Sequence, residues 1–126
     1  MANEITASCS LRYRETPIDI EFSSNSFNDD VAGNDGHFLT QVVTTSEAPL
    51  ELGTVGTLGY FKARNNSSTS TEIIRLRTDT TANSGVEFAR INPGAECMFQ
   101  WDETITAPQV TSDLGSPQLM YAIIEA

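Results

Sequence analysis

Apolar and polar residues alternate along most of this chain with a period of two. In residues 5–13 the apolar positions are the odd ones, and in residues 18–22, which follow Pro17, they are the even ones. This rhythm predicts strands with one apolar face. Further strand-like segments are expected at residues 37–45, 50–52, 60–65, 72–77, 86–91, 97–101, 107–111 and 118–125.

These segments predict an all-β protein. Gly, Pro, Asn, Ser and Thr interrupt every window long enough for a helix, which leaves about eight to ten short strands, the spacing of a sandwich or barrel. We expect an antiparallel β-sandwich that forms a single domain over residues 1–126. Residues 118–125 are apolar on both faces, which indicates a central strand or burial in an oligomer. Residues 107–111 are expected to form a short edge strand.

Residues 23–36 are predicted to form a long acidic loop, since Ser, Asn, Asp and Gly dominate it. Its only sizeable apolar residues are Phe27 and Val31. The Asp and Asn oxygens of residues 28–36 are of the kind that calcium binds, but their spacing does not match a calcium loop. A solvated loop is therefore the favoured interpretation, with calcium as the alternative, and no other cofactor is expected.

The charge balance limits the classes of partner. The chain has 17 acidic and 7 basic residues, a net charge of −10. A polyanion without a basic cluster is repelled by DNA, so we expect no nucleic-acid partner. No apolar run approaches the ~20 residues of a membrane-spanning helix, and no signal peptide is evident, so we expect no membrane partner and synthesis in the cytoplasm.

Few residues offer catalytic chemistry, and we expect no enzymatic activity. His37 is the only histidine, and no motif surrounds either cysteine. Cys9 and Cys97 fall on predicted apolar strand faces, which favours two buried thiols. Trp101, together with Phe99 and Tyr60, is expected in the core, although a sugar-stacking platform is the alternative.

Several short segments resemble those of small tailed-phage virion proteins. The resemblance begins with the opening residues and includes a Thr-x-Glu segment, a Leu-x-Leu step, a Gly-aromatic strand, a closing Arg-Asn, a strand that runs into a Pro-Gly turn and an acidic C-terminal strand. These segments are residues 1–6, 45–47, 50–53, 59–61, 64–65, 88–96 and 121–125. The acidic 23–36 loop departs from the pattern. The resemblance implies a jelly-roll sandwich and transfers no catalytic residues.

The resemblance implies a structural role on a phage particle. The expected function is to bind the outer capsid surface, with the major capsid protein as partner, and to cement the head as a homotrimer. Expected contact residues are large or cationic side chains in the N-terminal segment and the polar loop: Arg12, Arg14, Phe27, Val31 and His37. The alternative is a tail, neck or head-fibre module that binds host-surface carbohydrate or another virion protein.

Overall fold

In the computed structural model, residues 5–23, 27–29, 35–78, 86–102 and 104–126 are described. These residues contain twelve strands and no helix, so no helix there is long and apolar enough to cross a bilayer. The chain divides into two compact units, Met1–Ala32 and Gly33–Ala126. The expectation of one domain over residues 1–126 stays a prediction, and each unit is described separately below.

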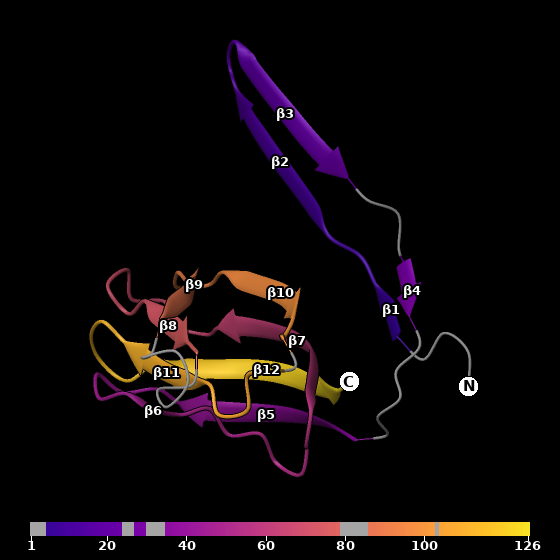
Figure 1. The fold of residues 1–126 in the computed structure, drawn as a ribbon. Coiled ribbons are helices and arrows are strands. Elements are labelled where there is room, and N and C mark those ends of the chain that lie inside the picture. Colours follow the sequence, from indigo (N-terminus) through magenta and orange to yellow (C-terminus); the bar gives the residue numbers. More distant parts are fainter. Residues whose placement is uncertain (1–4, 24–26, 30–34, 79–85, 103) are drawn as a thin grey trace. The chain divides into compact units, whose positions relative to one another are not determined.

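The unit Gly33–Ala126 is a β-sandwich of two four-stranded antiparallel sheets (Figure 1). One sheet has the order β10-β7-β12-β5 and the other β6-β11-β8-β9. The strands are β5 (Gly36–Val42), β6 (Ala48–Pro49), β7 (Leu58–Asn65), β8 (Ile74–Arg77), β9 (Glu87–Ile91), β10 (Glu96–Gln100), β11 (Gln109–Ser112) and β12 (Gln118–Glu125).

The strand order is that of a jelly roll. When the eight strands are counted from β5, the first sheet contains strands one, eight, three and six, and the second contains strands two, seven, four and five. Two interleaved Greek keys produce this order. The predicted all-β, jelly-roll-like sandwich is therefore confirmed, and β12 is central, between β5 and β7 (Figure 1).

The core forms where the apolar faces of the two sheets meet. Tyr121 and Phe61 from the first sheet and Ile74, Leu76 and Val110 from the second are buried in one cluster. Each alternates with an exposed or half-buried neighbour in its strand, which is the pattern that a strand with one buried face requires.

A buried polar side chain, Asn65, fixes one end of this core. Its amide nitrogen donates to the carbonyl oxygens of Glu72, at 2.7 Å, and Ile91, at 3.1 Å. Its amide oxygen accepts a hydrogen bond from the Ser67 backbone N–H. The side chain thereby joins the end of β7 to the following loop and to the end of β9, and its burial costs little because every polar atom is bonded.

The unit Met1–Ala32 contains two pairs of antiparallel strands. One pair is β1 (Ile5–Ala7) with β4 (Phe27–Asp29), and the other is the hairpin of β2 (Ser10–Glu15) with β3 (Ile18–Ser23). The chain turns between β2 and β3 at Thr16 and Pro17.

Three expectations from the sequence are wrong in detail. Residues 27–29, expected in a loop, form β4 because they pair with β1. The strand expected at residues 107–111 lies at 109–112 and is interior, between β6 and β8, rather than an edge. Cys9 is exposed, since the chain leaves strand geometry at residues 8–9, between β1 and β2.

Candidate interaction surface

The two arginines predicted to contact a partner are already paired within the β2–β3 hairpin. Arg12 faces Glu21 across the hairpin, with Nε 3.7 Å from the carboxylate, and Arg14 faces Asp19, with Nε 3.5 Å away. All four side chains are exposed. Such exposed cross-strand pairs contribute about 0.2–1 kcal/mol each, and they neutralise both cations.

The other predicted contact residues do not form one group. Phe27 lies in β4, opposite Ala7, and belongs to the same unit as Arg12, whereas His37 lies in β5 of the sandwich. Val31 lies outside the described residues, as does most of the candidate calcium loop at residues 28–36. Among the residues that the structure describes, no group of three His, Cys, Asp or Glu side chains is placed to hold a metal ion.

His37 belongs to a small polar cluster at the start of β5. Its Nε2 atom accepts a hydrogen bond from the Thr54 backbone N–H at 3.2 Å and lies 2.8 Å from the Thr54 hydroxyl oxygen. The same Nε2 lies 3.4 Å from a carboxylate oxygen of Asp35. The Thr54 hydroxyl donates to Asp35, and this bond holds the pKa of that carboxyl below its usual value.

This cluster ties the 53–54 turn to β5. Gly53 has a φ of +62°, and a Cβ atom there would lie 2.6 Å from the His37 ring, so only glycine fits. A hydrolytic triad uses both ring nitrogens, one for the nucleophile and one for the carboxylate. Here Thr54 and Asp35 both approach Nε2, and the hydroxyl bonds to the carboxylate directly, which is the geometry of a structural clamp.

The outer edge of β5 is open. Val43 N–H donates to Pro117 O, so the odd-numbered residues of this strand direct their main-chain groups toward β12. The even-numbered residues direct theirs to the other side, where β5 ends the sheet. Within the described part of the chain, no hydrogen-bond partner meets those main-chain groups at Phe38, Thr40 and Val42.

The side chains next to this open edge are apolar and exposed. Phe38 is 69% exposed and Val42 is 56% exposed, although both lie on a regular strand. The register continues this area inward to Met120 and Ala122 on β12, which are half-buried. Exposed apolar residues that are contiguous on a sheet face are typical of interaction sites.

Two cations border the apolar area on β7. Lys62 lies beside Ala122, and Arg64 lies beside Met120. Lys62 reaches Glu96 of β10 at 3.9 Å, whereas no carboxylate among the described residues lies within ion-pair distance of Arg64. Together with Phe38, these residues line a shallow hollow of about 160 Å³. We call Phe38, Thr40, Val42, Lys62, Arg64, Met120 and Ala122 the β5 surface.

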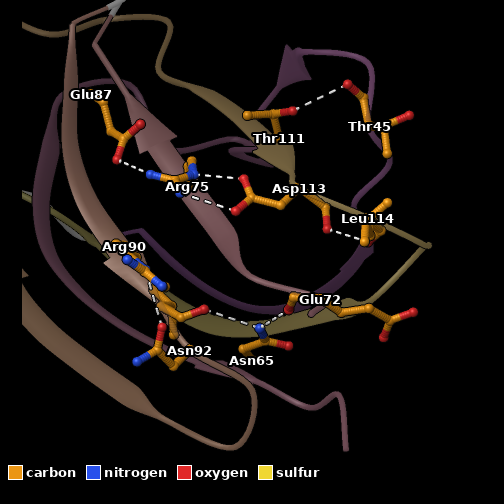
Figure 2. A network of polar contacts seen from close by, with 12 residues as sticks. Thr45, Asn65, Glu72, Arg75, Glu87, Arg90, Asn92, Thr111, Asp113 and Leu114 are labelled. Atoms are coloured by element: carbon orange, nitrogen blue, oxygen red, sulfur yellow. Dashed lines mark hydrogen bonds and ion pairs between the residues drawn. The ribbon is translucent and has the colours of Figure 1, made fainter. Parts of the chain in front are cut away.

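The outer face of the opposite sheet carries a network of polar contacts (Figure 2). Arg75 donates two hydrogen bonds to Asp113, at 2.6 and 3.0 Å, and one to Glu87, at 2.6 Å. These bonds raise the pKa of Arg75 and lower that of Asp113. Arg77 lies 3.9 Å from Glu47. Two carboxylates match the charge of Arg75, whereas Nε of Arg77 is buried without a hydrogen-bond partner among the described residues. This face is polar, unlike the β5 surface.

Of the aromatic residues considered as a sugar-stacking platform, Trp101, Phe99 and Tyr60, the first two lie in the core or pack against it. Trp101 is only 5% exposed, and its ring meets those of Phe61, Phe88 and Phe99 edge-on, at centroid distances of 4.9–5.4 Å. Edge-to-face contacts of this kind stabilise a core. Trp101 therefore has the predicted core position, and the most exposed aromatic side chain on the sandwich is Phe38.

Sequence reasoning did not identify the β5 surface as a site. The alternation in residues 37–45 places Phe38 and Val42 on one face and Leu39 and Val43 on the other, and both pairs are apolar. Two apolar faces on one strand were the available signal for this surface, since a strand of a sandwich normally has one polar face toward solvent. The open edge itself depends on which strands become neighbours, which the pattern does not specify.

Comparison with known proteins adds no identification. No protein-family model matches the chain. No curated protein matches it either.

Proposed function

We propose that this protein is a structural, non-catalytic component of a phage virion. It binds the outer surface of the capsid through the major capsid protein and cements the head, as a homotrimer. The observation that best supports this proposal is the β5 surface, where an open strand edge and uncovered apolar side chains coincide. Such an edge accepts an extended strand from a partner, and neighbouring side chains supply specificity.

The homotrimer gives this attachment its strength. A closed three-fold assembly presents three identical β5 surfaces to a capsid with matching symmetry. Once the first surface is bound, the others bind at high effective concentration, so weak individual contacts give a stable attachment. The contacts then hold neighbouring capsid subunits together against the pressure of packaged DNA.

Capsid attachment is tested with capsids that lack this protein. The purified protein is mixed with them, sedimented, and the particles are imaged by electron microscopy. Wild-type protein is expected to cosediment and to appear in many copies over the head. The double variant Phe38→Ser, Val42→Ser is expected to bind at least about tenfold more weakly.

Leu114→Ser is the matched control. Leu114 is also an exposed aliphatic side chain, but it follows β11 and lies outside the β5 surface. This variant is expected to bind like the wild type. Absence of wild-type binding, or equal weakening by both changes, would contradict the proposal.

The alternative is a tail, neck or head-fibre module that binds host-surface carbohydrate or another virion protein. One observation favours a sugar: exposed Phe38 borders a hollow together with Lys62 and Arg64, and aromatic faces next to polar side chains suit stacked ligands. Binding on a glycan array that is lost in Phe38→Ser, with virion copies confined to one vertex, would support this alternative over cementing.

A further inference from the structure

The β2–β3 hairpin has two chemically different faces. Its polar face carries the ion pairs Arg12–Glu21 and Arg14–Asp19, each joining residues directly opposite in the register. Every charge on this face therefore has a partner within the hairpin. No unpaired cation or carboxylate remains there to select a charged ligand.

The other face is mainly apolar, and Glu15 shares it opposite Ile18. Leu11 is 67% exposed, and Ile18, next to the turn, is 49% exposed. The register pairs Leu11 with Phe22 and Tyr13 with Ile20. By strand periodicity, these positions belong to the same side of the hairpin as Ile18. A two-stranded hairpin by itself is marginally stable in water, so this face gains most from being covered.

The hairpin is also nearly neutral within a strongly acidic chain. Residues 10–23 contain two arginines and three carboxylates, a net charge of −1, against −10 for the whole chain. Two copies of the protein repel each other over most of their length. The hairpin is a place where copies can meet at low electrostatic cost.

We infer that the apolar face of the β2–β3 hairpin is a self-association surface, and that its occupant is the same face of a second copy of this chain. A second copy offers a face of equal size and mainly apolar character, on which Glu15, beside the turn, is the one charged residue. Burying Leu11 and Ile18 from each copy supplies the hydrophobic free energy. The inference deepens the proposed function. It rests on that proposal only for the number of copies in the assembly, which the proposal gives as three.

The first test measures the mass of the full chain in solution by sedimentation or light scattering. Wild-type protein is expected to have a mass that is a multiple of 13.7 kDa. The double variant Leu11→Asn, Ile18→Thr is expected to shift toward the single-chain mass, with self-association weakened by roughly tenfold or more. The matched control Arg12→Thr, Glu21→Thr changes the polar face and should keep the wild-type mass.

Two measurements keep this test decisive. Trp101 fluorescence reports on the sandwich, since Trp101 lies in the core of the Gly33–Ala126 unit, and it should not change in either variant. In a Cys9→Ser background, Leu11→Cys is expected to give a covalent dimer with a short bismaleimide crosslinker, whereas Arg12→Cys is not. This second measurement detects the contact without disrupting the apolar face.

The outcomes separate the two proposals. A trimer that dissociates only in the apolar-face variant supports both. A dimer that does so supports the hairpin inference and contradicts the trimer. A monomeric wild type, or a mass that the apolar-face variant does not change, overturns the hairpin inference. The capsid test stands apart, because Phe38→Ser, Val42→Ser alters a different unit and should leave the mass unchanged.

Discussion

The side-chain amide of Asn65 donates a hydrogen bond to the carbonyl oxygen of Ile91, 3.1 Å away in the interior of the sandwich (Figure 2). The two residues end β7 and β9, which belong to different sheets. One side chain thus connects two layers whose strand ladders belong to separate sheets.

Asn65→Ala is expected to destabilise the sandwich by about 2–3 kcal/mol, because it leaves the buried carbonyl oxygen of Ile91 and the partly buried one of Glu72 without this donor. Urea unfolding followed by Trp101 fluorescence measures the change. Asn66→Ala is the control, since Asn66 is the exposed neighbour, and it should stay within about 0.5 kcal/mol of the wild type. Equal effects of the two changes would refute the role assigned to Asn65.

Phe61 is expected to be the most costly of the aromatic residues to truncate. It is buried and contacts the rings of Phe99, Trp101 and Tyr121. Phe61→Ala should lower the free energy of unfolding by about 3–5 kcal/mol. Phe88→Ala removes the same atoms from a ring that is 42% exposed, so its cost should be clearly smaller. Thermal denaturation of both variants provides the comparison.

Stability is expected to decrease in acid partly through Asp113. Its hydrogen bonds from Arg75 lower the pKa of the carboxyl in the folded chain. A carboxyl of this kind stabilises the fold above its unfolded pKa, ~3.9, and the contribution is lost as the pH falls through the folded value. Asp113→Asn should therefore weaken the fold near neutral pH and reduce the dependence of the urea midpoint on pH below about 4.

The control for the acid prediction is Asp19→Asn. Asp19 pairs with Arg14 on the exposed hairpin, outside the unit whose unfolding Trp101 reports. Its substitution is expected to leave the pH dependence of that unfolding unchanged. The same pH profile for Asp113→Asn and the wild type would exclude the assigned contribution.

The two thiols are expected to react at very different rates. Cys9 is exposed, whereas burial raises the pKa of Cys97 to about 11. At pH 8 only about a thousandth of Cys97 is thiolate, the reactive form. A thiol reagent should therefore label one cysteine rapidly in the folded protein. Cys9→Ser should abolish the fast labelling phase, and Cys97→Ser should leave that phase unchanged. The two variants thereby assign the fast rate to Cys9 and the slow rate to Cys97.

The sequence pattern predicted the strands and their buried faces well. The alternation that places Leu119, Tyr121 and Ile123 inward is the alternation in the structure, and the apolar character of both faces correctly indicated a central β12. Period two is a local property of a strand, so it can be read without knowledge of the partner strands.

Errors arose where the outcome depended on a distant partner. Residues 27–29, Phe-Asn-Asp, have low strand preference, yet they pair with β1, which overrides the preference. The position of β11 inside its sheet depends on β6 and β8 rather than on its own residues. The open edge of β5, the central part of the candidate site, is likewise a property of sheet order.

The place of β12 has a consequence for synthesis of the protein. The sheet β10-β7-β12-β5 acquires its middle strand from residues 118–125, after all its other strands have been made. While the nascent chain lacks this segment, β5 and β7 have no hydrogen-bonding neighbour between them and the core is missing Leu119, Tyr121 and Ile123. The sandwich therefore closes in a late step, and until then the emerging chain exposes unpaired strand edges of the kind that are prone to aggregation.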